Sequence, residues 1–148
     1  MLKRYRFWLI AAVLFQFLTA VLHTITFFLA PHPENETEAQ LNTMMRTYHQ
    51  DMGAGFVRTP WDLLTALSTC LPLLCLLGGL TLGYLLIKHI EPALMKGVIA
   101  INLAIFLVAL IIMIFFAFLV PVVLVGLIVI NLAIAYILCP NIESAVDI

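Results

Sequence analysis

Long apolar runs, separated by a few polar segments, dominate the pattern of hydrophobic and polar positions along this chain. The runs cover residues 7–30, 61–87 and 98–138. As a single helix the last run would be about 60 Å long, about twice the thickness of the bilayer hydrocarbon core. Pro121 is expected to divide it, because the residue before a proline disfavours helical backbone. The pattern predicts four transmembrane helices, at about residues 7–30, 61–87, 98–118 and 121–138.

The second predicted span has clear boundary signals. Thr59 is a suitable N-cap, Pro60 fits the first helical position and Asp62 the third. Positive side chains suit a helix C-terminus, and Lys88 and His89 follow the apolar run. These residues place the helix between about 61 and 87.

The polar segment between the first two spans has a shorter pattern of its own. Asn35 and Glu38 form an N-x-x-E capping arrangement. Apolar residues then recur on one helical face: Leu41, Met44, Met45, Tyr48 and Met52. Gly53 is expected to end this helix. We predict a short amphipathic helix at about 36–52, lying on the membrane surface or over the helix bundle.

Composition supports a membrane protein. Hydrophobic residues make up 64% of the chain and charged residues 10%, whereas soluble domains have about 45–50% and about 25%. The net charge of −1, with no basic run, argues against nucleic acid as a partner. The expected fold is an all-α integral membrane protein with residues 1–148 forming one four-helix transmembrane domain.

The distribution of basic residues predicts the orientation of the spans. Five lie on one side: Lys3, Arg4, Arg6, Lys88 and Lys96. Arg46 and Arg58 lie on the other. Cytoplasmic loops carry the excess of Lys and Arg. We therefore expect both termini to be cytoplasmic and residues 31–60 to face outward.

Few polar side chains are available for chemistry. His23 lies in the outer part of the first span, on a polar stripe with Gln16, Thr19 and Thr26. An ionisable residue inside a span is a functional candidate, although hydrogen bonding to a neighbouring helix explains it equally. A candidate outer-face site consists of His23, Arg46, His49, Asp51, Arg58, Trp61 and Asp62. Several of these have a structural explanation too, because Arg58 and Asp62 can pair across a helix start and Asp62 suits a capping box.

Other residues indicate helix packing. Gly79 and Gly83 form a small-xxx-small pair, and Asn102 and Asn131 occupy two copies of Ile-Asn-Leu-Ala-Ile. Small residues allow close helix approach, and membrane asparagines hydrogen-bond between helices. We expect Asn102 and Asn131 to be able to bond to each other in an antiparallel hairpin.

No motif indicates a cofactor, a metal or a catalytic group. Met45, His49 and Met52 suit copper(I) by ligand type, but the apolar stripe already accounts for the methionines. Cys70, Cys75 and Cys139 do not form a redox motif and are expected to act as small hydrophobes. We expect no cofactor, no metal and no catalytic residue.

One run resembles a known group. Arg46, Asp51-Met52-Gly53 and Arg58-Thr59-Pro60-Trp61-Asp62 are similar to a run in small, uncharacterised bacterial four-helix integral membrane proteins, as is Phe115-Phe116 before Pro121. The likeness covers about residues 45–138, and residues 63–68 depart from it because the group has an aromatic- and glycine-rich run there. It implies four spans and a bacterial inner membrane, and brings no activity with it.

The leading hypothesis is a non-enzymatic membrane protein. It would be an accessory or binding subunit that packs against a larger membrane complex, associates with itself, or holds a lipophilic ligand such as a lipid or quinone. The alternative is a membrane enzyme or redox component whose outer-face site acts on a lipid-like or quinone-like substrate. The orientation of His23 distinguishes the two, because a catalytic His23 would face His49 or Arg58 across a cavity.

Overall fold

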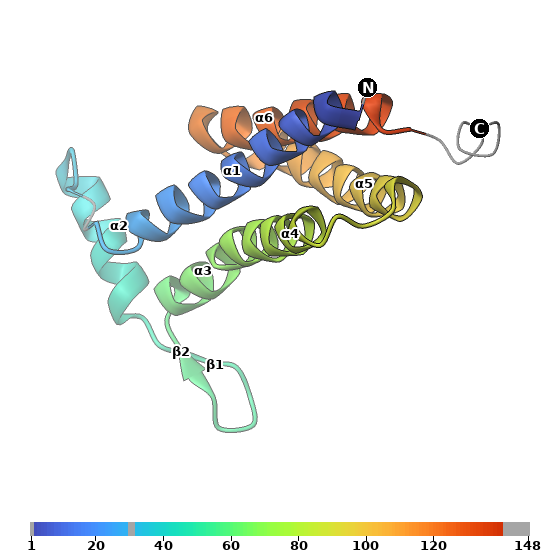
Figure 1. Cartoon of the computed structure of the whole chain (residues 1–148). Coiled ribbons are helices and arrows are strands. Elements are labelled where there is room, and N and C mark those ends of the chain that lie inside the picture. The colour runs from blue at the N-terminus through green and yellow to red at the C-terminus, as the bar shows by residue number, and fades with distance from the viewer. Residues whose placement is uncertain (1, 30–31, 141–148) are drawn as a thin grey trace, which may run out of the picture. The chain divides into compact units, whose positions relative to one another are not determined.

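The computed structural model describes residues 2–29 and 32–140, most of which are helical (Figure 1). The elements follow in the order α1 (Leu2–Thr26), α2 (Glu36–Thr47), β1 (Gln50–Asp51), β2 (Val57–Arg58), α3 (Pro60–Ser68), α4 (Cys70–Ile87), α5 (Pro92–Phe116) and α6 (Leu119–Leu138). They form two compact units. The first combines the described residues of Met1–Ala20 and Leu74–Ile148, and the second is Val21–Leu73.

Four helical segments in the described part of the chain are long and apolar enough to cross a membrane. They are Arg4–Thr26, Pro60–Ile87, Pro92–Phe116 and Leu119–Leu138. The predicted number of such helices is therefore confirmed. Three boundaries move by several residues: α1 and α5 begin earlier than the apolar runs do, and α1 ends at Thr26, four residues before its predicted end. A helix can include basic residues at its end that an apolar run excludes, because long basic side chains reach the membrane interface.

The turn between α5 and α6 lies closer to α5 than predicted. Ala117 and Phe118 have extended backbone, and α6 begins at Leu119. Pro121 is thus the third residue of α6 instead of the first. A proline is tolerated there because the first N–H groups of a helix have no partner within the helix.

The predicted amphipathic helix at 36–52 is too long. Asn35 caps α2 as expected, but α2 ends at Thr47, and Tyr48 is already extended. Instead of helix, Gln50 pairs with Arg58 and Asp51 with Val57 in a short antiparallel ladder. The apolar stripe therefore does not continue to Met52.

A glycine-rich turn explains the ladder. Gly53, Ala54 and Gly55 all have positive φ, at 82°, 52° and 83°. The two glycines adopt this conformation without steric cost. Together with Ala54 they form a run of three left-handed residues that closes the hairpin. The Asp51 carboxylate accepts the Gly53 N–H at 2.8 Å. Gly53 is thus part of a hairpin turn, and the prediction that it ends a helix is wrong.

In the first unit, α1, α4 and α5 meet at Gly78. A methyl group added at Gly78 would lie 2.8 Å from Asn102 Oδ1, 2.9 Å from Gln16 Oε1 and 3.2 Å from Phe106. Gln16 is completely buried here. Small residues permit this close approach, which replaces the hydrophobic driving force that lipid cannot supply.

The packing residues expected from the sequence have unequal roles. A methyl group on Gly79 would lie 3.3 Å from Gln16 Oε1, whereas one on Gly83 would make ordinary contact with Val13 at 3.8 Å. Asn102 and Asn131 do not bond to each other in the described structure. Each donates to the carbonyl four residues earlier in its own helix, Val98 at 2.9 Å and Leu127 at 2.7 Å.

Replacing Gly78 with alanine should destabilise the first unit. The new methyl group would meet two amide oxygens that are held in the core, so overpacking should cost about 1–3 kcal/mol. Gly97→Ala is the matched control, because nothing lies within 4 Å of the added atom. Thermal unfolding in detergent measures both. Equal stability of the two variants would show that the three helices do not meet closely at Gly78.

Candidate functional site

All seven residues of the candidate outer-face site lie in the unit Val21–Leu73. The end of α1 carries His23, α2 carries Arg46, the hairpin region carries His49, Asp51 and Arg58, and α3 carries Trp61 and Asp62. Because one compact unit contains them, their contacts can be compared directly. Each of them has a specific partner within this unit.

His23 binds a backbone carbonyl. Its Nε2 donates to the Ser68 oxygen at 3.1 Å, and its ring packs edge-on against Phe27 with centroids 5.4 Å apart. Ser68 lies at the end of α3, and Pro72 follows four residues later. Proline has no N–H, so it cannot supply the usual helical bond to the carbonyl four residues earlier. His23 therefore satisfies a carbonyl that Pro72 leaves without its helical donor.

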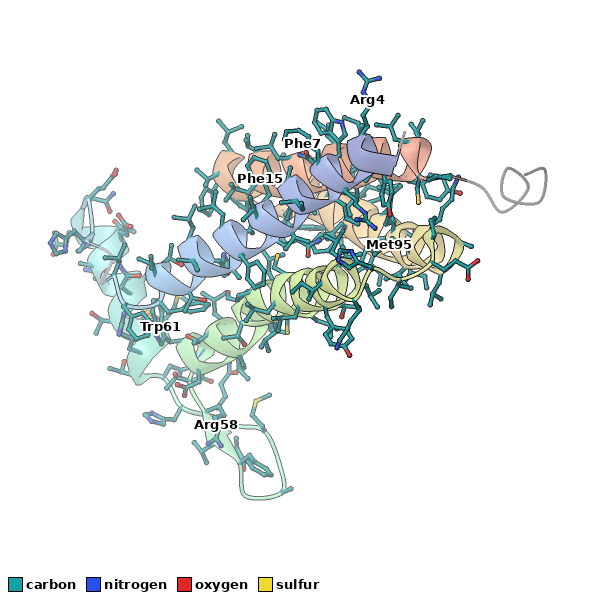
Figure 2. The ribbon with its side chains drawn as sticks, in the orientation of Figure 1. Arg4, Phe7, Phe15, Arg58, Trp61 and Met95 are labelled. Atoms are coloured by element: carbon teal, nitrogen blue, oxygen red, sulfur yellow. The ribbon has the colours of Figure 1, made fainter. Side chains whose placement is uncertain are left out.

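Arg46 and Trp61 join α2 to α3. The guanidinium carbon of Arg46 lies 4.0 Å from the centroid of a Trp61 ring. Figure 2 shows Trp61 beside α2, at the start of α3. A cation over an indole face is attractive, and more so where water is partly excluded. This contact fixes the end of α2 against α3 and leaves the face of the guanidinium covered.

The Asp62 side chain forms part of a capping box at the start of α3. Its carboxylate accepts the Thr59 N–H at 2.9 Å, and the Thr59 hydroxyl accepts the Asp62 N–H at 3.2 Å. This is the arrangement expected from the sequence. One of the two carboxylate oxygens, Oδ2, is thus used to satisfy the helix N-terminus.

The other charged candidates are engaged in the hairpin region. Arg58 donates to the Val57 carbonyl at 2.8 Å and lies 5.6 Å from the Phe56 ring centroid. His49 donates to the Thr47 carbonyl at 2.7 Å, and Asp51 binds the turn as described above. The predicted ion pair between Arg58 and Asp62 does not form within the described residues. These side chains stabilise their own loop.

Of the seven residues, only Arg46 and Trp61 are in direct contact with each other. Within residues 21–29 and 32–73, no hydrogen bond or ring contact joins His23 to His49 or to Arg58. Nor does any group of three or more His, Cys, Asp or Glu in the described chain have metal-binding geometry. Among the described residues, the seven candidates therefore make no hydrogen bond to one another and form no set of metal ligands.

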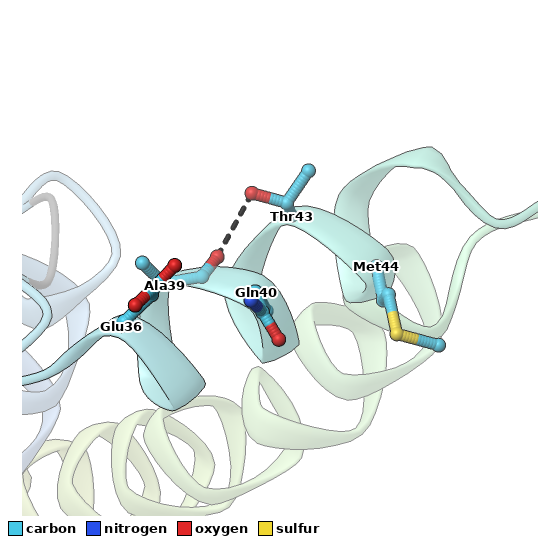
Figure 3. A pocket seen from close by; sticks show the side chains of 5 residues that line it. All are labelled: Glu36, Ala39, Gln40, Thr43 and Met44. Carbon is cyan, nitrogen blue, oxygen red and sulfur yellow. Dashed lines mark hydrogen bonds between the residues drawn. The ribbon is translucent and has the colours of Figure 1, made fainter.

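A hollow on α2 does not change this conclusion. It is lined by Glu36, Ala39, Gln40, Thr43 and Met44, all from one helix (Figure 3). Thr43 donates its hydroxyl to the Ala39 carbonyl at 2.8 Å. Ligand sites are concave and have polar groups converging from several elements. A hollow along one helix face lacks that convergence.

The cysteines in the described structure remain separate thiols. Cys139, just after α6, donates to the Pro92 carbonyl at 3.5 Å. Burial raises the pKa of the Cys139 thiol, and the nearby Lys96 only partly opposes this. The thiolate is the reactive form of cysteine, so Cys139 is unsuited to nucleophilic or redox chemistry.

Sequence reasoning missed the Ser68 carbonyl and the role of Pro72. A signal was present, because any proline within a helix identifies a carbonyl four residues earlier that lacks its donor. That signal does not name the side chain that satisfies the carbonyl. The partner, His23, is 45 residues away along the chain.

Comparison with protein-family models, curated proteins and solved structures gave no match. The contacts within the chain are therefore the basis for any assignment of function.

The stability that is lost when His23 is removed should depend on Pro72. We expect His23→Ala to reduce stability in detergent by about 1 kcal/mol, as for other hydrogen bonds within membranes. In a Pro72→Ala background the same change should cost clearly less, because an alanine at position 72 can donate its N–H to the Ser68 carbonyl. A double-mutant cycle of unfolding free energies measures this coupling.

His49→Ala is the matched control for this cycle. His49 is exposed and binds a carbonyl two residues away. The free energy of unfolding lost in His49→Ala should therefore be nearly the same with proline or alanine at position 72. An equal cost of His23→Ala in both backgrounds would mean that His23 has a role other than satisfying Ser68.

Proposed function

We propose that this chain is a small, non-enzymatic integral membrane protein that acts as an accessory or binding subunit. The observation that carries the proposal is the bond from His23 to the Ser68 carbonyl. His23 is the clearest ionisable candidate inside a span, and its donor atom is used to complete a helix. A side chain whose Nε2–H is used within the fold in this way supports a structural role.

The remaining polar candidates support the same proposal. Arg46 stacks on Trp61, Asp62 caps α3, and Asp51 closes the hairpin turn. An enzyme would need at least some of these groups aimed at a common point where a substrate atom can lie. Because their partners lie within the fold itself, the function is better sought in what the surfaces of the protein contact.

We propose that α2 lies in the headgroup region of the membrane. No residue of α2 is buried, and Leu41 and Met44 are 55% and 64% exposed. An amphipathic helix with exposed apolar residues gains by burying them at the lipid interface. Trp61, which holds the end of α2, belongs to a residue type that concentrates at the same depth.

We further propose that both termini are cytoplasmic and that the membrane is a bacterial inner membrane. The positive-inside bias supports the orientation, since Arg4, Arg6, Lys88 and Lys96 belong to the opposite set of loops from Arg46 and Arg58. The resemblance of residues 45–138 to small bacterial membrane proteins supports the location. The partner would be a larger membrane complex, a second copy of the chain, or a lipophilic ligand.

Purification in a mild detergent tests the subunit assignment. We expect intact-complex mass spectrometry to find a second protein, a second copy or a lipid-like molecule bound in fixed ratio. An absorption spectrum of the same sample should show no chromophore. A strictly monomeric protein that carries nothing would contradict the proposal, and turnover of a lipid or quinone that is lost in His23→Ala would favour an enzyme.

Single cysteines test the orientation. In a background without Cys70, Cys75 and Cys139, Ala54→Cys places a thiol in the hairpin turn, and Glu91→Cys places one between α4 and α5. A membrane-impermeant maleimide added to intact spheroplasts should label the first variant. It should label the second only after permeabilisation. The opposite labelling pattern would show that the orientation is inverted.

A further inference from the structure

Arg6 carries a charge that no anion in the described structure compensates. Its Nη1 lies 3.4 Å from His89 Nδ1, and its Nε lies 3.5 Å from the Tyr5 hydroxyl. Tyr5 is buried, with 1% of its surface exposed, so the guanidinium is anchored at one edge. Within residues 2–29 and 32–140, no carboxylate pairs with Arg6. Guanidinium donors are therefore held in place without an anionic partner.

The contact with His89 fixes the roles of the imidazole nitrogens. Arginine stays protonated and can only donate, so Nδ1 of His89 accepts in this contact. A neutral imidazole that accepts at Nδ1 carries its hydrogen on Nε2. The pair thus presents N–H groups from both Arg6 and His89, which are the donors that phosphate oxygens require.

The backbone of His89 is in an unusual conformation for its residue type. His89 has φ of +50° and follows the end of α4. Its N–H bonds to the Leu86 carbonyl at 3.2 Å, and the Ile90 N–H bonds to the Leu85 carbonyl at 3.4 Å. This is a Schellman motif, in which the left-handed position normally holds glycine. A histidine at this position accepts a conformational cost and brings an imidazole to Arg6.

The residues next to this pair along α1 and α4 are typical of a lipid interface. Phe7, next to Arg6, is 64% exposed and packs edge-on against Trp8 at 5.5 Å. Tyr84 is 59% exposed, and the Lys88 ammonium lies 5.7 Å from its ring centroid. Exposed aromatic rings beside basic groups concentrate at headgroup depth in membrane proteins. Free phosphate has no apolar part that could contact such rings, whereas the acyl chains of a phospholipid would cover them.

We propose that Arg6 and His89, with the neighbouring Lys88, bind the phosphate of an anionic phospholipid. The guanidinium pairs with the phosphate oxygens, the His89 Nε2–H donates a further bond, and Lys88 adds positive charge. Basic residues at the cytoplasmic ends of helices bind such headgroups in other membrane proteins. This site lies in the first compact unit and does not depend on the identity of the partner subunit.

Lipid titration followed by native mass spectrometry tests the proposal. The purified full chain in a non-ionic detergent is titrated with phosphatidylglycerol and, separately, with phosphatidylcholine. The wild type should bind phosphatidylglycerol more tightly. Arg6→Gln should weaken this binding about fivefold, the effect of one basic side chain at an anionic lipid surface, and weaken the binding of phosphatidylcholine less, because its choline group offsets the phosphate charge.

Two further variants separate binding from folding. Arg4→Gln removes the same charge from an exposed side chain that projects away from the helices (Figure 2), and it should bind nearly as the wild type does. His89→Gly places the favoured residue at a left-handed position, so it should fold at least as stably and still bind phosphatidylglycerol more weakly. Full lipid binding by His89→Gly and Arg6→Gln would overturn the proposal.

Inorganic phosphate distinguishes the two sources of a phosphate group. If the lipid is the ligand, millimolar phosphate should not displace phosphatidylglycerol from the wild type. Displacement that is lost in Arg6→Gln would mean that the site takes a free phosphate, and would overturn the assignment to a lipid. Equal weakening by Arg4→Gln and Arg6→Gln would show a general charge effect and no site.

Discussion

Every backbone polar group inside a bilayer needs a partner within the protein, because hydrocarbon offers none. Polar side chains need partners there for the same reason, and several of them use backbone carbonyls. His23 donates to the Ser68 carbonyl, Thr19 to Phe15, Asn102 to Val98 and Asn131 to Leu127. Only the first of these bonds reaches a different helix. Polar residues that a sequence suggests as functional thus find their hydrogen-bond partners mainly on the backbone of the helices that carry them.

Two polar groups in the first unit depart from this rule. Gln16 is completely buried, and neither its Oε1 nor its Nε2 has a hydrogen-bond partner in the described structure. Arg6 contacts Tyr5 and His89, and no carboxylate among the described residues pairs with it. Unsatisfied polar groups are rare in native proteins and mark places that need an explanation. Gln16 packs closely against Gly78 in the core, whereas Arg6 is partly exposed, so an outside ligand can supply its anionic partner.

The features of the fold that are predictable from the sequence are those that depend on the local pattern of residues. Apolar runs identify the four span-like helices, and the capping residues Asn35 and Thr59 fix two helix starts within one residue. The hairpin at 50–58 was not predictable from the apolar stripe, because the left-handed backbone of Gly53, Ala54 and Gly55 outweighs helical periodicity there. Periodicity describes which face a helix would bury, and it does not measure the cost of competing turns.

The candidate site shows what residue type alone does not predict. The seven outer-face residues were chosen for their chemical type, and type does not reveal whether a partner is already present in the fold. His23 and Arg6 are both polar groups near helix ends, yet His23 completes a carbonyl released by Pro72 while Arg6 has no anionic partner among the described residues. The distinction rests on contacts between residues 45 positions apart in one case and 83 in the other. A search for function in a small membrane protein should therefore begin from the polar groups whose partners are missing, because those are the groups that a ligand can stabilise.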